Sequence, residues 1–256
     1  DHHLPADHLP EAVAVLDPKR HDCEYPFKEL SGCGVGFKLV QAYALRNNIP
    51  FSEVERLLDM VVVSIASDIV PLTGENRILA HFGLKRLNEN PSKGLLSIIK
   101  ICGLEKHTIT IDDIVFKIGP RINAAGRMGQ IDLAIELFLT DDPARGQASA
   151  KALCELNKQR QAVESDIYQQ VVDMLPEGQL PEAIVLADES WHQGVVGIVA
   201  SRISEEYCCP TFLICLDGDH GKASSRSYGG FNLFSSLTAL SPLLESYGGH
   251  ELAAGF

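Results

Sequence analysis

The sequence predicts an α/β protein in which a largely helical first part is joined by a long helix to a smaller α/β domain. Residues 35–142 contain successive apolar runs at helical spacing, several of them preceded by helix-capping residues. Residues 143–176 keep one apolar face without a break, whereas residues 177–256 alternate short apolar runs with turn residues. We therefore expect a first domain over 1–142, a connecting helix over 143–176 and a second domain over 177–256.

The first part should be mostly helical. An apolar run at residues 12–16, which Asp17-Pro18 ends, predicts one short strand. Ser52 with Glu55 three residues later has the pattern of a capping box. Helices are expected over residues 35–47 and 91–102, from Ser52 toward Asp68, from Thr73 onward and from Thr110 onward. The helix after Thr73 should turn the following apolar residues toward a core: Ile78, Leu79, Phe82 and Leu84.

The long helix should begin at Asp142-Pro143, because proline suits the first turn of a helix, and should end near Pro176. Its apolar face is formed by Leu153, Leu156, Val163, Ile167, Val171 and Met174. At 1.5 Å per residue such a helix is roughly 45 Å long. In the last part, strands are expected over residues 183–187, 211–216 and 222–228, and helices over residues 195–207 and 231–247.

The composition limits the classes of protein that are possible. A net charge of −12 argues against broad electrostatic adhesion to nucleic acid, although it leaves room for a local basic surface. The 7 cysteines are odd in number and scattered, which favours reduced thiols in a cytoplasmic protein. No apolar run approaches the ~20 residues that a membrane-spanning helix needs, so we expect no membrane partner.

The first three residues, Asp1-His2-His3, place a carboxylate and two imidazoles within one turn. These are ligands that divalent metal ions prefer. Asp68 follows an apolar run over residues 60–66 and is expected to be buried, where a carboxylate needs a cation or strong donors. A metal ion shared by Asp68 and a histidine of the first loop would meet that need, whereas an exposed polar start of the chain is the alternative.

A segment at residues 118–129 combines three glycines and a proline with Arg121, Asn123 and Arg127. Arginine binds phosphate through a planar fork, and small neighbours let a phosphate chain come close. The segment therefore predicts a phosphate-binding surface. The alternative is a connecting loop whose arginines are solvated.

Two constellations in the last part can also hold an anion. Ser225 and Arg226, within Ser224-Ser225-Arg226-Ser227, supply a hydroxyl and a guanidinium on an expected strand. An edge strand with outward polar residues explains the same pattern equally well. Gly248-Gly249-His250 lets backbone N–H groups and an imidazole reach one anion, although a helix end followed by an isolated histidine fits the pattern better on its own.

Asp1-His2-His3 and Ser67-Asp68-Ile69-Val70-Pro71-Leu72 together resemble the DHH phosphoesterase superfamily. Gly119-Pro120-Arg121-Ile122-Asn123-Ala124-Ala125-Gly126-Arg127 looks very like a motif of the RecJ-type single-strand-specific exonucleases. The Ser-x-Arg-Ser strand and the Gly-Gly-His turn resemble the DHH-associated substrate-binding domain; Ser225 stands where many relatives have glycine. The resemblance extends from residue 1 to residue 256.

The resemblance implies roles for individual residues. His2 and Asp68 would be metal ligands, His3 would contact the scissile phosphate, and Asp1 would orient a histidine. The residues implied to bind the nucleic acid are Arg121, Asn123, Arg127, Ser225, Arg226, Gly248, Gly249 and His250. Two manganese ions, or magnesium ions, are expected in the full-length protein.

The implied activity is 5′–3′ degradation of single-stranded DNA in repair and recombination, with a helicase or a single-strand-binding protein as a class of partner. The family also has two metal-binding motifs upstream of the triplet, so we expect the chain to be an inactive fragment without them. A related oligoribonuclease, cyclic-dinucleotide phosphodiesterase or phosphoadenosine phosphatase is the first alternative. A non-catalytic nucleic-acid-binding relative is the second.

Overall fold

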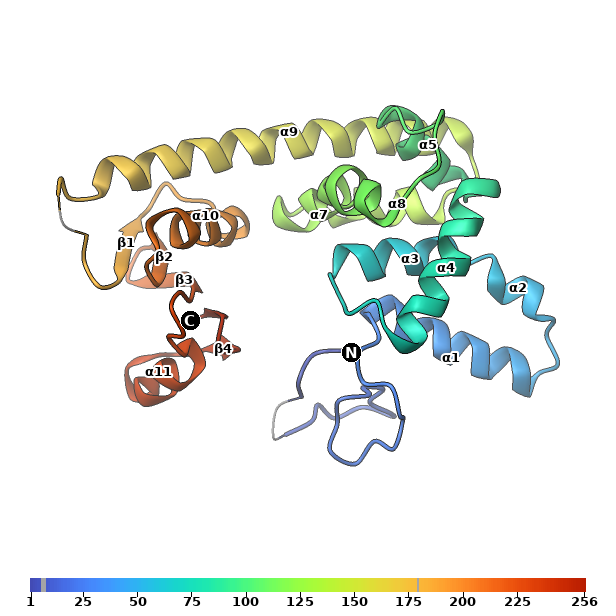
Figure 1. Cartoon of the computed structure of the whole chain (residues 1–256), viewed down its shortest axis with the longest axis horizontal. Coiled ribbons are helices and arrows are strands. Elements are labelled where there is room, and N and C mark those ends of the chain that lie inside the picture. The colour runs from blue at the N-terminus through green and yellow to red at the C-terminus, as the bar shows by residue number, and fades with distance from the viewer. Residues whose placement is uncertain (6–7, 179) are drawn as a thin grey trace. The chain divides into compact units, whose positions relative to one another are not determined.

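The computed structural model describes residues 1–5, 8–178 and 180–256, and the chain folds into two compact units. Unit 1 comprises residues 1–125 and 131–154, and unit 2 comprises residues 126–130 and 155–256. Unit 1 is helical, and unit 2 combines helices with a five-stranded sheet. The predicted mixed α/β class is confirmed (Figure 1). The predicted domain boundaries at 142 and 176 stay predictions.

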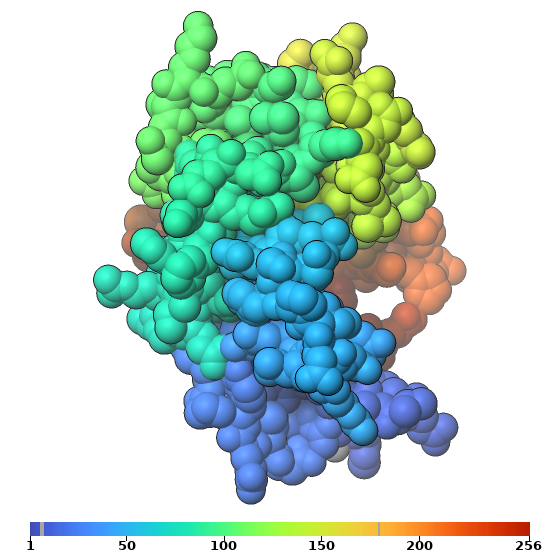
Figure 2. Space-filling view, turned by 90° about the vertical axis from the view of Figure 1, so that its right-hand side faces the viewer, coloured from blue at the N-terminus to red at the C-terminus, as the bar shows by residue number. Residues whose placement is uncertain are grey.

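Unit 1 is built on a buried helix, α3 (Leu58–Ser67), whose apolar residues face neighbours on several sides. The other helices of unit 1 are α1 (Gly32–Arg46), α2 (Phe51–Glu55), α4 (Gly74–Glu89), α5 (Lys93–Ile101), α6 (Ile111–Asp113), the π-helix Ile114–Ile118, most of α7 (Gly119–Arg127), and α8 (Ile131–Leu139). Helices α1 and α4 pack against α3, and α5 packs against α8. Figure 2 shows this helical part, coloured blue to green, as a densely filled face.

One carboxylate in α3 is fully buried, and it is Asp59 rather than Asp68. Asp59 Oδ1 accepts a hydrogen bond from the Met60 backbone N–H at 2.9 Å, and Oδ2 accepts one from the Ser92 backbone N–H at 2.7 Å. The second bond ties α3 to the start of α5, because Ser92 is the N-cap of that helix. Asp59 is therefore a structural carboxylate.

Replacing Asp59 with alanine is expected to lower the free energy of unfolding of unit 1 by about 3 kcal/mol, because a charge-assisted bond is lost and a buried N–H is left unpaired. Urea denaturation followed by circular dichroism at a helical wavelength measures this loss. Glu89→Ala removes an exposed carboxylate from the end of α4 and should change little. Fluorescence of Trp191, the single tryptophan of this sequence, reports unit 2, and its midpoint should shift less than that of the helical signal; an unchanged helical transition would contradict the assignment.

Three expectations about the strands, caps and helix faces of unit 1 are wrong. Residues 12–16 form no strand, since all strands of the described residues lie in unit 2 and a lone strand has no partner for its backbone. Ser52 does not cap α2, whose N-cap is Pro50 without a side-chain bond. In α4, Leu79 is buried as expected, but Ile78 and Phe82 are exposed. Thr110 does open α6, through a capping box with Asp113.

The predicted long helix is α9 (Pro143–Met174), and it begins at the expected proline (Figure 1). Asp142 Oδ1 accepts a hydrogen bond from the Ala144 backbone N–H at 2.9 Å, which satisfies a donor of the first turn. Residues up to Cys154 belong to unit 1 and the remainder to unit 2. No helix among residues 1–5, 8–178 and 180–256 is long and apolar enough to span a bilayer.

The sheet of unit 2 has the order β1-β2-β3-β5-β4. Its strands are β1 (Ile184–Asp188), β2 (Thr211–Asp217), β3 (His220–Arg226), β4 (Gly248–Gly249) and β5 (Ala253–Gly255). Strands β1 and β2 are parallel and are joined through α10 (Gln193–Tyr207), while the other pairs are antiparallel. Parallel neighbours need such a crossover, and the two strands and the helix agree with the sequence expectation.

Each face of the sheet has its own apolar core. On one face, α9 and α10 pack on β1 and β2 through a cluster that includes Ile167, Val195 and Leu213. On the other face, α11 (Leu233–Ala239) packs through Leu233 and Leu237. The expected helix over residues 231–247 is wrong in length, because Pro242 lies in a short 3₁₀ turn (Ser241–Leu243) and proline cannot continue the hydrogen bonds of an α-helix.

Candidate active-site residues

The N-terminal triplet is organised by the Asp1 carboxylate. Asp1 Oδ1 accepts hydrogen bonds from the backbone N–H groups of His2 at 2.7 Å and His3 at 3.3 Å, and it lies 2.8 Å from His3 Nδ1. These contacts fix the local turn and engage Nδ1 of the His3 ring, whose side chain is exposed. The carboxylate therefore orients His3, and its contact with His2 is through the backbone.

His2 is the half-buried member of the triplet, and its ring lies against the first turn of α1. A Cβ atom added at Gly32 would be 3.5 Å from His2 Cδ2 and 3.8 Å from Nε2. Desolvation, followed by the charge of His3, lowers the pKa of His2, while the nearby Asp68 carboxylate acts in the opposite direction. A lowered pKa keeps the imidazole neutral near pH 7, which is the form that binds metal ions.

Asp68 is exposed, so the expectation of a buried carboxylate is wrong. The apolar run ends before it, and Asp68 is the C-cap of α3, where Ser64 Oγ donates to its Oδ2 at 3.2 Å. The carbonyl end of a helix carries partial negative charge, so a carboxylate there is unfavourable unless a cation is near. The next residue, Ile69, has φ 52°, a strained conformation for a β-branched side chain.

The oxygen of Asp68 and the ring nitrogen of His2 fit a manganese or magnesium ion by their chemistry. Both residues belong to unit 1, and the charge of Asp68 acts on His2. However, the described parts of the chain contain no group of three or more histidine, cysteine, aspartate or glutamate side chains arranged to hold a metal ion. His2 and Asp68 can therefore supply only part of a coordination sphere.

Arg121 and Asn123 lie in α7, so residues 119–127 form a helix rather than a loop. Arg121 Nε donates to Cys154 Sγ at 3.2 Å, and its Nη1 donates to the Lys117 carbonyl oxygen. Most of the Arg121 fork is therefore used inside unit 1. Asn123 is exposed and stays available for a ligand.

Arg127 ends α7 and packs against the first turn of α10 within unit 2. Its Nη1 donates to the Gly194 carbonyl oxygen at 3.3 Å, and its own carbonyl oxygen lies so close to Gly194 that a Cβ atom there would be 1.9 Å away. Desolvation, followed by the positive charge of Arg160, lowers the pKa of Arg127. Arg127 as a whole nevertheless remains exposed, so its guanidinium, repelled by Arg160, is accessible to an anion that would stabilise it.

Arg226, at the end of β3, is the neighbour of Arg127. Arg226 Nε donates to Ser201 Oγ at 3.2 Å, and Nη1 donates to the Ser225 carbonyl oxygen at 2.8 Å. Desolvation, followed by the positive charge of Arg127, lowers the pKa of Arg226. The two guanidiniums that the sequence predicted separately are thus brought together in one unit.

Ser225 does not share the face of Arg226, which corrects the sequence interpretation. Ser225 pairs with Phe212 and Ala254 across the sheet, is fully buried, and its Oγ has no hydrogen-bond partner. Its neighbour Ser224 instead lies on the α10 face with Arg226, since a Cβ atom at Gly197 would be 2.6 Å from Ser224 Oγ and 3.4 Å from Arg226 Nη2. Strand side chains alternate between faces, so the pattern Ser-Ser-Arg already contained this information.

Gly248 and Gly249 form β4, and His250 follows in the turn toward β5, which lies between β4 and β3, the strand that carries Arg226. The His250 backbone N–H donates to the Ala253 carbonyl oxygen at 2.9 Å, and Ala253 pairs with Arg226 in the sheet. His250 Nδ1 accepts a hydrogen bond from the Leu252 backbone N–H at 3.2 Å, which leaves Nε2 free to face solvent. Gly249 has φ 137°, and a Cβ atom there would be 2.4 Å from the Ala253 carbonyl oxygen, so the turn requires glycine.

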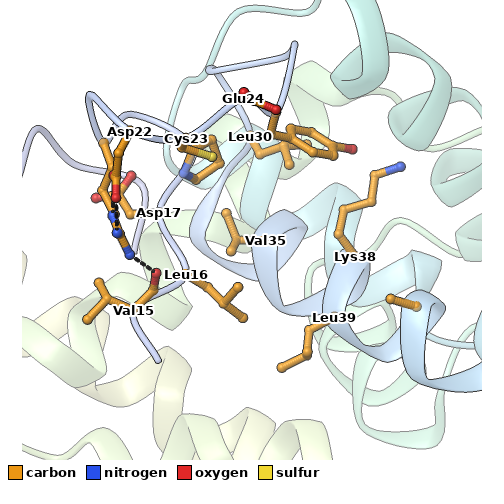
Figure 3. A pocket seen from close by; sticks show the side chains of 14 residues that line it. Val15, Leu16, Asp17, Asp22, Cys23, Glu24, Leu30, Val35, Lys38 and Leu39 are labelled. Atoms are coloured by element: carbon orange, nitrogen blue, oxygen red, sulfur yellow. Dashed lines mark hydrogen bonds and ion pairs between the residues drawn. The ribbon is translucent and has the colours of Figure 1, made fainter. Parts of the chain in front are cut away.

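A cavity of about 550 Å³ lies elsewhere in unit 1, between the loop at residues 15–25 and α1. Figure 3 shows its walls, which are mostly apolar and include Leu16, Leu30, Val35 and Leu39. Arg20, which pairs with Asp22, closes one side. No predicted site residue lines this cavity, so its size alone does not make it the functional site.

Comparisons with known proteins identify the relatives of this chain. Residues 180–256 match the DHHA1 domain family. The chain is 39% identical to the single-stranded-DNA-specific exonuclease RecJ of Bacillus subtilis, over all of this chain and 32% of that protein, and 33% identical to RecJ of Escherichia coli, over all of this chain and 48% of that protein. The crystal structure of RecJ in complex with Mn²⁺ from Thermus thermophilus superposes with a TM-score of 0.87 at 36% identity, covering 100% of this chain and 37% of that one. The chain thus spans a third to a half of the length of these curated relatives.

Proposed function

We propose, because this chain belongs to the RecJ family over its whole length, that it forms part of a metal-dependent 5′–3′ exonuclease that hydrolyses single-stranded DNA. The observation that carries the proposal is the likeness to RecJ enzymes, at 33–39% identity over the whole of this chain. Related RecJ structures contain Mg²⁺ or Mn²⁺, so a divalent ion is the proposed cofactor, with two ions in the full-length protein.

In this proposal unit 1 binds the metal ion and the scissile phosphate, and unit 2 binds the phosphates of the DNA backbone. His2 and Asp68 hold the metal, whose chemistry is to activate water and neutralise charge on the phosphate. His3, oriented by Asp1, contacts the scissile phosphate through its other ring nitrogen. In unit 2, Arg127 and Arg226 bind backbone phosphate, and the adjacent turn offers the His250 ring. A role in DNA repair and recombination, beside a helicase or a single-strand-binding protein, follows from the proposed substrate.

The test is degradation of 5′-labelled and 3′-labelled single-stranded DNA by the full-length protein with manganese. The 5′ label should be released first, as a mononucleotide, and a duplex of the same sequence should resist. Release of the 3′ label first, or faster cleavage of RNA or of a cyclic dinucleotide, would instead support another phosphodiesterase of the superfamily. Binding without cleavage would support a non-catalytic relative.

Replacing Arg127 with alanine is expected to weaken binding of a single-stranded oligonucleotide about tenfold. The plot of the logarithm of the association constant against the logarithm of the salt concentration should become less steep by about 0.7, the value for one phosphate contact on a single strand. Fluorescence anisotropy at several salt concentrations measures both quantities. Arg202→Ala removes the same charge from the same unit, where the arginine stacks on Tyr168 at 3.7 Å, and should leave the slope unchanged. Equal effects of the two variants would argue against a specific contact by Arg127.

A further inference from the structure

Two ion pairs on α9 lie close together in sequence but differ in their surroundings. Lys158 pairs with Glu155 at 3.4 Å, and their side chains are 73% and 61% exposed. Arg160 pairs with Glu164, and their side chains are 11% and 19% exposed. Arg160 Nη2 also donates to Asn157 Oδ1 at 2.9 Å, so two acceptors hold its fork. Burying an ion pair costs desolvation free energy and contributes little net stability, so stability alone does not explain the Arg160–Glu164 pair.

The buried pair lies beside Arg127. The segment at residues 126–130 belongs to unit 2, where Met128 packs on the same apolar cluster as Val163 of α9 and Val195 of α10. Val163 directly precedes Glu164, so this packing puts the segment that carries Arg127 against the same stretch of α9 as the pair, while Arg127 itself donates to the first turn of α10. The electrostatics agree, because Arg160 and Glu164 both act on the pKa of Arg127, in opposite directions.

The charges of this cluster do not balance. Arg127, Arg160 and Arg226 carry three positive charges, and Glu164 carries one negative charge, which leaves a net charge of two. Arg160 cannot bind a ligand with a fork that Glu164 and Asn157 already occupy. It can, however, repel the Arg127 guanidinium toward the Gly194 carbonyl oxygen, the acceptor that this guanidinium is observed to use.

We propose that the Arg160–Glu164 ion pair is a positioning pair, which holds the Arg127 guanidinium in the orientation that binds a nucleic-acid phosphate. The inference rests on the proposed function, since it concerns how Arg127 meets the phosphate. Glu164 fixes Arg160, and Arg160 in turn excludes Arg127 from the α9 side of the cluster. Without Glu164, the freed Arg160 fork would move, and Arg127 would lose its defined place.

Glu164→Gln separates positioning from simple electrostatics because the two explanations predict opposite changes in oligonucleotide affinity. The substitution adds one positive charge to the cluster, so electrostatics alone would tighten binding of an anionic strand. Positioning predicts that binding of a single-stranded oligonucleotide weakens about fivefold to tenfold. Glu155→Gln makes the same change of charge in the exposed pair of the same helix and should not weaken binding.

The decisive measurement is a double-mutant cycle in the full-length protein, with oligonucleotide affinity measured by anisotropy. Glu164→Gln should have its effect in the wild-type background and lose it when Arg127 is alanine, because the pair acts through Arg127. Arg160→Lys keeps the charge but loses the planar fork, and should behave in the same way. Thermal melting followed by circular dichroism confirms that each variant is folded.

The outcomes distinguish failure of the proposed phosphate contact by Arg127 from failure of the positioning pair. If Arg127→Ala leaves affinity and salt slope unchanged, the proposed phosphate contact fails, and the positioning pair fails with it. If Arg127→Ala weakens binding but Glu164→Gln tightens binding, or weakens it equally in both backgrounds, the proposed contact survives and the positioning pair is overturned. Should Glu164→Gln not fold, the cycle with Arg160→Lys decides: weaker binding that disappears when Arg127 is alanine supports the positioning pair, and unchanged binding, or an equal loss in both backgrounds, overturns it.

Discussion

Replacing Asp68 with alanine in the full-length protein is expected to abolish metal-dependent cleavage while leaving the fold intact. A metal ion that polarises a phosphoryl oxygen lowers the activation barrier by several kcal/mol, and each 1.36 kcal/mol is a factor of ten in rate. A loss of about a thousandfold or more follows if Asp68 is a ligand. Stability should change by less than about 1 kcal/mol or should rise, because the carboxylate is exposed at the negative end of α3.

The measurements for Asp68 are the cleavage rate, manganese binding by calorimetry, and the midpoint of thermal unfolding. Asp22→Ala is the matched control, because it removes an exposed carboxylate from the same unit, one that pairs with Arg20. Asp68→Asn keeps the shape of the side chain and should be as inactive as Asp68→Ala. Normal manganese uptake and cleavage by either Asp68 variant would remove Asp68 from the metal site.

Replacing Gly194 with alanine is expected to have the largest structural effect in unit 2. The added Cβ atom would lie 1.9 Å from the Arg127 carbonyl oxygen and 2.8 Å from its carbonyl carbon, so backbone must move. Gly194 also donates its backbone N–H to His192 Nδ1 at 3.1 Å, the cap of α10. We expect a loss of about 3 kcal/mol or more in stability, beyond ordinary overpacking, together with a loss of oligonucleotide affinity.

The unfolding of unit 2 in the Gly194 variant is measured through Trp191, which lies three residues away in the buried cluster. Gly126→Ala is the control, since nothing lies within 4 Å of a Cβ atom at that helical position. Alanine there should be neutral or should stabilise by up to about 1 kcal/mol, because glycine is a poor helix former. If Gly194→Ala kept the wild-type melting midpoint and affinity, the close approach of Arg127 to α10 would be wrong.

Much of the fold could be predicted because local signals agreed with the tertiary structure. Asp142-Pro143 marks the start of α9, and the alternation of apolar runs after residue 182 gives β1, α10 and β2. The predictions that failed depended on neighbours that a local pattern does not specify. The run at residues 12–16 has strand composition but no strand to pair with, and α8 was not predicted at all.

The sequence predicted which residue types form the candidate site, but it predicted less well which way their side chains face. Arg127 and Arg226 were suggested by two separate motifs, and the structure places both in unit 2, where the charge of Arg127 lowers the pKa of Arg226; their role in binding stays a prediction. The choice of Ser225 over Ser224 overlooked strand alternation, which is a local rule. The choice of Asp68 over Asp59 as the buried carboxylate required knowledge of which turn of α3 meets α5, and only packing decides that.

The shared helix α9 has a consequence for cooperativity. Ala150 and Leu153 are buried in unit 1, whereas Ile167 and Val171 are buried in unit 2, and all four are on one continuous run of backbone hydrogen bonds. Melting of either unit releases one end of that run, and a helix that loses its packed end frays from there. Ligand that stabilises one unit should therefore slow amide hydrogen exchange in the part of α9 that belongs to the other.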